Sequence, residues 1–173
     1  MYPTAYIDYL IHFHGDRDYF ECHEILEDYW KQSDPGNKDS IWVGLILMAV
    51  SAYHHRRENF AGAKRTLEKA IKIFETQADS LVKLGIDSGD LINVLNERLL
   101  AIEANHFYTS FSLPIIDSAL MDECLKICQQ RGLEWGKASD VTNDELIHRH
   151  KLRDRTSVIE ERNRMLLAKK GNL

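Results

Sequence analysis

The chain has 173 residues with a net charge of −5, and 44% of its residues are hydrophobic. That composition describes a globular domain with enough apolar residues for a core, either alone or with an extension. The longest nearly apolar run, residues 41–52, is too short to cross a bilayer, so no membrane association is expected. The first residues lack the basic segment of a signal peptide.

Cys22, Cys124 and Cys128 are the three cysteines of the chain. Their number is odd, and none of them forms a C-x-x-C pair. These features indicate reduced thiols, and they favour a cytoplasmic location.

The pattern of apolar residues and breaks predicts an all-α fold. Five helices are expected in a core domain of residues 1–105, at about 3–14, 16–32, 40–57, 60–84 and 88–105. Asp16 is the expected cap of the second helix, and Ser88 that of the fifth. The third helix is apolar on every side through Val50, so its residues 41–57 should form a buried central helix. The other helices should pack around it as antiparallel hairpins.

Residues 106–173 are predicted to form a helical C-terminal extension, packed on the core domain or on a partner chain. Residues 106–114 are expected to be extended, followed by a helix over 114–130 and a loop over 132–139. Thr142 and Glu145 have the spacing of a capping box, which predicts a last helical region.

Charge is unevenly distributed along the chain. Residues 148–173 carry +5, so residues 1–147 carry −10. A basic tail beside an acidic body favours docking of the tail on its own chain or on a partner. Self-association or a protein partner is therefore expected. Nucleic-acid binding is not, because the tail has no aromatic residues among its basic ones.

An H-E-x-x-E motif provides the candidate site. His23 and Glu27 are four residues apart, so they are neighbours at the edge of a broad apolar helix face, with Glu24 just outside it. Ionisable groups in such a position cost free energy unless each finds a partner.

Three interpretations of this motif remain open. The first is a structural polar lock, in which His23 and Glu27 bond His54, His55 or Arg56 of the third helix. The second is a site for Zn, Mn or Fe at His23 and Glu27, with His54 or His55 as a further ligand. The third is metal-free proton transfer, with Glu24 and Glu27 as the catalytic candidates.

Three ordered blocks resemble a known family. They are Phe20-x-x-His23-Glu24-x-x-Glu27-x-x-Trp30, the segment from Gly44 to Ala49, and the segment from Tyr53 to Ala63. Over residues of about 10–75 the chain resembles the bacterial and archaeal family known as domain of unknown function 309. The resemblance implies a small all-helical fold and no established activity. Many members have Gln where this chain has Leu47, so a possible polar partner of the His–Glu pair is missing.

Taken together, the sequence predicts a small cytoplasmic helical binding or scaffold module with a buried, structural His–Glu pair. The alternative is a metal-dependent hydrolase that uses His23, Glu27 and a histidine of the third helix.

Overall fold

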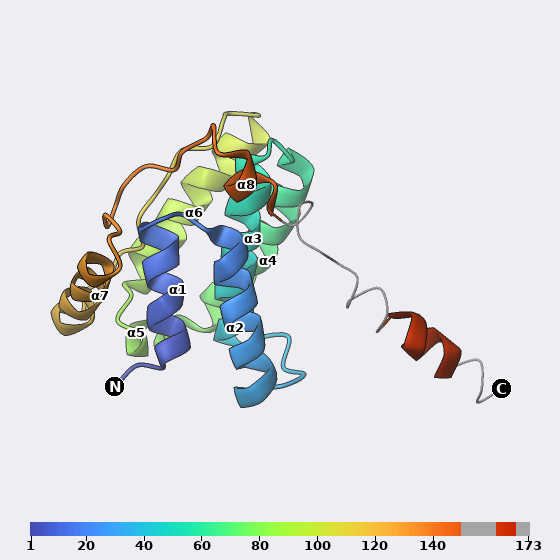
Figure 1. Ribbon diagram of the computed structural model, residues 1–173, viewed down its shortest axis with the longest axis horizontal. Coiled ribbons are helices and arrows are strands. Elements are labelled where there is room, and N and C mark those ends of the chain that lie inside the picture. Colours follow the sequence, from blue (N-terminus) through green and yellow to red (C-terminus); the bar gives the residue numbers. More distant parts are fainter. Residues whose placement is uncertain (150–161, 169–173) are drawn as a thin grey trace.

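The computed structural model describes residues 1–149 and 162–168, and it confirms the all-α fold (Figure 1). Its helices are α1 (Thr4–His14), α2 (Tyr19–Ser33), α3 (Ile41–Arg56), α4 (Phe60–Thr76), α5 (Ala78–Lys83), α6 (Ser88–Glu103), α7 (Ser118–Gln130) and α8 (Asp144–Ile147). Residues 162–168 form a further helical segment. In the part of the chain that the structure describes, extended pairing is limited to one antiparallel bridge between Ile86 and Ile115. None of the helices there is both long and apolar enough to cross a membrane.

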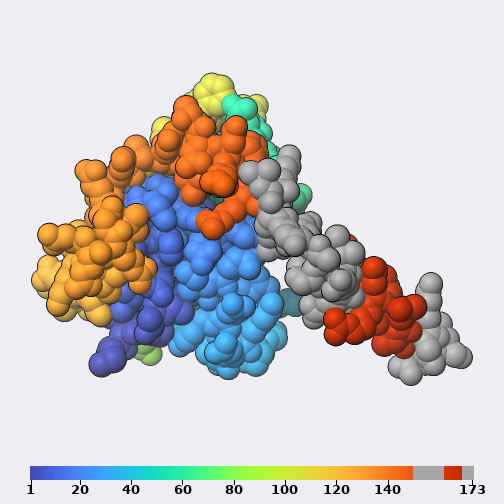
Figure 2. All heavy atoms as spheres, viewed as in Figure 1, coloured from blue at the N-terminus to red at the C-terminus, as the bar shows by residue number. Residues whose placement is uncertain are grey.

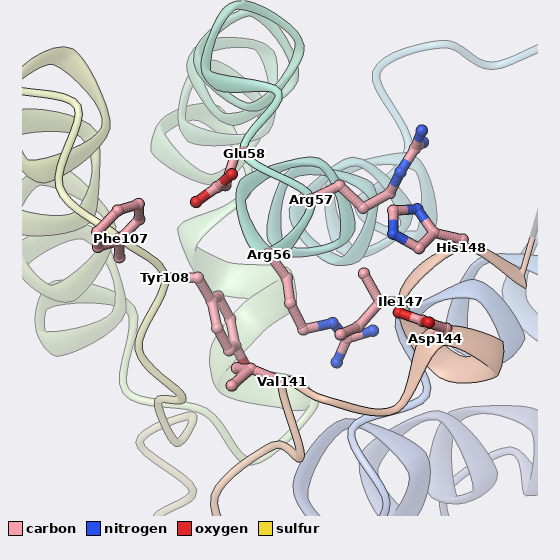
Figure 3. A pocket seen from close by; sticks show the side chains of 9 residues that line it. All are labelled: Arg56, Arg57, Glu58, Phe107, Tyr108, Val141, Asp144, Ile147 and His148. Atoms are coloured by element: carbon pink, nitrogen blue, oxygen red, sulfur yellow. The ribbon is translucent and has the colours of Figure 1, made fainter.

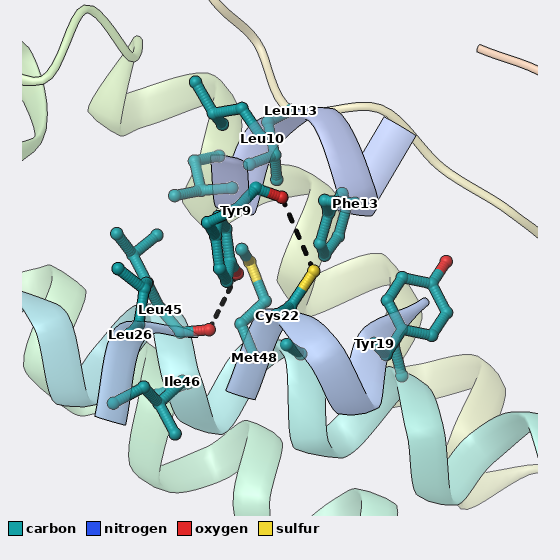
Figure 4. Close-up of a cluster of buried hydrophobic side chains, with 14 of the residues drawn as sticks. Tyr9, Leu10, Phe13, Tyr19, Cys22, Leu26, Leu45, Ile46, Met48 and Leu113 are labelled. Atoms are coloured by element: carbon teal, nitrogen blue, oxygen red, sulfur yellow. Dashed lines mark hydrogen bonds between the residues drawn. The ribbon is translucent and has the colours of Figure 1, made fainter. Parts of the chain in front are cut away.

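The central helix α3 lies between α2 and α4, and α4 in turn packs on α6. Gly44 allows the close approach of α4, because a Cβ at this position would lie 2.8 Å from the ring of Phe74. On the other side, the hydroxyl of Tyr9 donates to the Leu45 carbonyl at 2.7 Å (Figure 4). The thiol of Cys22 donates to the Tyr9 carbonyl at 3.4 Å. These two bonds fix α1 against both α2 and α3.

The second helix begins later than predicted. Its cap is Asp18, whose carboxylate accepts the amide of Glu21 at 3.1 Å, so the expected cap at Asp16 is wrong. Arg17 explains the shift, because its φ of 57° reverses the chain direction immediately before Asp18. Asp16 instead accepts the amide of Asp18 and lies 3.1 Å from the ring of His12.

Other boundaries differ as well. The predicted fourth helix is two helices, α4 and α5, which meet at Gln77; its side chain bonds Asp39 and Ser80 rather than solvent. Asp87 caps α6 in place of Ser88. The helix predicted from residue 114 begins at residue 118 because the preceding residues are extended, with the amide of Ile116 donating to the Gly85 carbonyl at 2.7 Å.

Residues 106–149 pack along α1 by means of α7 and over the end of the molecule at which α1 stops and α2 begins (Figure 2). The ring of His14 joins three segments. It bonds the Leu10 carbonyl through Nδ1 at 2.8 Å, accepts the Leu113 amide at Nε2 at 3.0 Å, and stacks on Trp135 with centroids 4.1 Å apart. Asn143, rather than Thr142, caps α8. Of the predicted basic tail, residues 150–161 and 169–173 lie outside the described residues, and residues 162–168 are exposed.

Candidate functional site

The H-E-x-x-E motif forms a charged row along α2. His23 Nε2 lies 3.0 Å from a carboxylate oxygen of Glu27, and His23 Nδ1 lies 3.3 Å from Glu24. The second oxygen of Glu27 is 3.0 Å from Lys31 Nζ, one helical turn further on. The groups therefore stabilise one another on a single helix, as neighbours at i and i+4 do.

The His–Glu pair is partly buried, less completely than the sequence predicted. The side chains of His23, Glu24 and Glu27 are 28%, 41% and 33% exposed. They lie at the edge of the apolar face of α2. The ion pairs of His23 and Glu27 among the described residues run along α2.

Beside His23, a small apolar hollow opens between α2 and α3. It has a volume of about 160 Å³, and its walls are Tyr19, Phe20, His23, Val50, Tyr53 and His54. We call it the α2–α3 hollow. It places His54, and not His55, on the same side of the molecule as His23.

The hydrogen bonds of Asn59 define the state of His54. Asn59 Oδ1 accepts the Gly62 amide at 3.0 Å, which leaves its NH₂ group to donate to His54 Nδ1 at 3.3 Å. Burial, and then the charges of Arg57 and Arg65, lower the pKa of His54. The neutral ring therefore carries its proton on Nε2, where it is a hydrogen-bond donor and not a metal ligand.

His55 points away from the H-E-x-x-E motif. Its Nε2 lies 2.8 Å from the His106 carbonyl, and its ring meets those of Phe60 and Tyr108 edge to face. Burial lowers its pKa. The ring joins α3 to the connection after α6.

Arg56 forms a polar lock, with partners other than those predicted. Its Nη1 donates to the Arg17 carbonyl at 2.8 Å and to the Ser139 hydroxyl at 2.9 Å. Its guanidinium also lies 4.7 Å from the centre of the Tyr19 ring. Arg56 therefore ties α3 to the turn before α2 and to the segment after α7.

Sequence reasoning missed the residues that complete this lock. Arg17 is almost fully buried, and its guanidinium donates to the carbonyls of Phe13, Phe111 and Lys137. The hydroxyls of Tyr19 and Tyr108 are hydrogen-bonded to each other. Arg17 lies in a turn between two helices, so no periodic pattern marks it as buried.

Among the residues that the structure describes, two clusters have donor atoms close enough to hold a metal ion. In each, one ligand atom per residue lies within 4.8 Å of the others, and the clusters are His23–Glu24–Glu27 and His12–Asp16–Asp18. The second is already engaged, because Asp18 caps α2 and pairs with Arg149. The hydrogen bond that the His12 ring donates to Asp16 raises the pKa of His12, which favours its protonated form. The His23 cluster is thus the better candidate.

The family model described as Domain of unknown function (DUF309) matches residues 6–66. The chain is also 46% identical over 170 residues to "Uncharacterized protein YpuF" of Bacillus subtilis (strain 168), with 98% of each chain covered. The chain belongs to the DUF309 family. Every wall residue of the α2–α3 hollow lies in the matched DUF309 region. The similarity to YpuF continues through the C-terminal extension, and no solved structure matches the chain.

Proposed function

We propose that this DUF309 protein is a cytoplasmic helical binding module whose recognition surface is the α2–α3 face. Its ligand is a basic amphipathic helix. The observation that carries the proposal is the α2–α3 hollow, an apolar depression open to solvent beside a row of accessible carboxylates. The comparisons add no support for the hydrolase alternative.

The size and lining of the hollow suit one anchoring side chain. Its volume of about 160 Å³ is close to that of a single large apolar side chain. Tyr19, Phe20 and Tyr53 provide aromatic walls, and aromatic-lined pockets with a polar rim are typical of the energetic centre of a protein interface. His54 offers an N–H donor at the edge.

The charge of α2 selects a basic partner. The helix carries four acidic residues and one basic residue, and all five are at least partly accessible: Glu21, Glu24, Glu27, Asp28 and Lys31. Such a surface attracts positively charged partners and repels acidic ones.

A helix of this chemistry is present in the chain itself. Residues 162–168 are helical and exposed, with Arg162 and Arg164 followed by Met165, Leu166 and Leu167. The occupant of the hollow in our proposal is this segment of a second copy. An apolar side chain of the segment enters the hollow, and its arginines face the carboxylates of α2.

The proposal predicts self-association that depends on both surfaces. Val50→Arg places a charge in the hollow and Leu166→Asp removes an apolar anchor, so each should weaken association on the order of tenfold or more. Sedimentation velocity of the full chain over a concentration series measures this. Association should also weaken as salt rises, because exposed charge pairs are screened.

Val82→Arg is the matched control, because Val82 is an exposed apolar residue on α5, outside the hollow. It should associate like the wild type. Melting temperatures verify that each variant is folded. A wild type that stays monomeric at every concentration, or a Val50→Arg variant that associates normally, would contradict the proposal.

A second candidate function, metal binding at His23, is favoured by the position of Glu24. Glu24 lies beside Nδ1, so it can hold the ring proton there and leave the Nε2 lone pair directed toward Glu27. Imidazole and carboxylate together suit Zn²⁺, Mn²⁺ or Fe²⁺. Lys31 is mostly exposed and can move away from Glu27. With His54 a donor, such a site would have two protein ligands and open positions.

Titration with Mn²⁺ tests the metal site, because a paramagnetic ion broadens NMR signals close to it. Signals around residues 23–27 should disappear first, and His23→Gln should abolish the effect. His12→Gln is the control, since His12 belongs to the other cluster. Equal broadening at both clusters, or none, would leave the helical binding module as the only candidate.

A further inference from the structure

A second and larger cavity lies where α3 ends, with wall residues different from those of the α2–α3 hollow. It has a volume of about 520 Å³, and it opens between the end of α3, the connection after α6, and α8 (Figure 3). Its walls include Arg56, Arg57, Tyr108, Val141, Ile147 and His148. We call it the Arg56 cavity. Its residues come from both the DUF309 region and the C-terminal extension, so neither part forms it alone.

The side chain of Arg56 extends into the space between α3 and α8 (Figure 3). One of its N–H groups has no hydrogen-bond partner among the described residues. The residue is 6% exposed, and its Nε is buried without a partner among the described residues. Nδ1 of His148, in the same cavity wall, is also buried and unpartnered there. Leaving such donors unsatisfied costs free energy, and buried polar atoms without partners are rare in native proteins. Two of them in one cavity wall indicate a ligand with acceptor atoms.

The buried guanidinium of Arg56, and that of Arg17 behind it, form no ion pair with a carboxylate among the described residues. The described hydrogen bonds of Arg56 and Arg17 all go to neutral oxygens, namely backbone carbonyls and the Ser139 hydroxyl. The buried carboxylate of Asp18 is paired with Arg149 instead. Buried cations are normally compensated by an anion, so the missing compensation favours an anionic ligand.

We propose that the Arg56 cavity binds the phosphate group of a small organic phosphomonoester. A guanidinium matches phosphate oxygens in geometry as well as in charge, and Arg56 Nε and His148 Nδ1 are the donors left for it. Phosphate alone would leave most of 520 Å³ empty. Tyr108 and the exposed Phe107 and Val141 offer apolar contacts to the organic part.

Two carboxylates limit which phosphomonoesters fit. Glu58 and Asp144 are exposed wall residues of the same cavity. They repel a second anionic group on the ligand, and they accept hydrogen bonds from hydroxyl or ammonium groups. The ligand class is therefore a monophosphate whose organic part is neutral or cationic. This site is separate from the α2–α3 hollow, so it does not depend on the proposed function.

Phenyl phosphate is a suitable probe, because it combines one phosphate with one apolar ring. Titrated into the ¹⁵N-labelled full chain at low ionic strength, it should shift the amide signals of Arg57, Tyr108 and Ile147 and bind more tightly than inorganic phosphate. Phenol, which lacks the anion, should not bind. Arg56→Lys keeps the charge but removes Nε, and it should weaken phenyl phosphate binding on the order of tenfold.

Two further variants test the proposal independently, in case Arg56→Lys does not fold. His148→Phe keeps an aromatic ring without the Nδ1 donor, and Phe107→Ala removes a 74% exposed ring with little structural role. His148→Phe should weaken the binding of both inorganic phosphate and phenyl phosphate. Phe107→Ala should weaken only the binding of phenyl phosphate. Leu100→Ala, a similarly exposed apolar residue on α6, should change neither. Absence of binding, binding that shifts only distant amides, or equal affinity in wild type and His148→Phe would overturn the proposal.

Discussion

Lowering the pH from 7 to 4 should reduce the free energy of unfolding by about 3 kcal/mol through His14 alone. Burial lowers the pKa of His14 to about 3 in the folded protein. In the unfolded chain its pKa is about 6.5. Below that pH the His14 ring binds a proton in the unfolded state but stays neutral in the folded state. The contribution is therefore fully present above pH 6.5 and lost as the pH falls toward 3.

The hydrogen bonds of His14 likewise predict that protonation of its ring destabilises the folded state. Nδ1 donates to the Leu10 carbonyl, so Nε2 must be the unprotonated nitrogen that accepts the Leu113 amide. A second proton on the His14 ring would set the Nε2–H group against the Leu113 amide N–H, on a ring that stacks on Trp135. Protonation thus requires the connection at Leu113 to detach.

Urea unfolding at pH 7, 5.5 and 4 tests this prediction. Carboxylates contribute to acid unfolding as well, so the comparison is with His14→Gln, which does not titrate. The variant should be less stable than the wild type at pH 7, and the difference should shrink by about 3 kcal/mol at pH 4. Parallel pH profiles for the two proteins would show that His14 is not held neutral.

Arg17→Ala should lower the free energy of unfolding on the order of 3–5 kcal/mol. The substitution leaves the carbonyls of Phe13, Phe111 and Lys137 without their donor in a buried place. The effect should be local as well as global. Hydrogen exchange should accelerate first around residues 111 and 137, which the guanidinium holds against the end of α1.

Arg131→Ala is the matched control for Arg17→Ala. Arg131 forms an accessible ion pair with Asp8 at 2.7 Å, and such pairs contribute about 1 kcal/mol or less. Denaturant midpoints for both variants measure the contrast. Similar losses for the two arginines would mean that the Arg17 network does not stabilise the fold.

The sequence was sufficient for the parts of the fold that depend on local patterns. The apolar run of residues 41–52 predicted the central helix α3. Helix starts were less accurate, because several acidic or hydroxyl residues near a turn can each cap a helix. The choice of Asp18 over Asp16 depends on the left-handed backbone of Arg17, which sequence periodicity does not encode.

The candidate site was predictable in its position but not in its surroundings. The i, i+4 spacing brought His23 and Glu27 together, as expected on one helix. Their exposure depends on how far α3 extends over the edge of α2, which is a tertiary property. The Arg56 cavity could not be predicted for the same reason, since some of its wall residues, such as Arg56 and Val141, lie more than 80 residues apart in the chain.

The bonds that tie α1 to the C-terminal half constrain how the chain can fold during synthesis. His14 meets the Leu113 amide across 99 residues, and Arg17 meets Lys137 across 120. Contacts between distant residues form late, whereas helical hairpins such as α3–α4 assemble locally. The end of α1 is therefore synthesised well before the segments that His14 and Arg17 contact. Until residue 137 has been synthesised, His14 and Arg17 lack the hydrogen-bond partners that the second half of the chain provides.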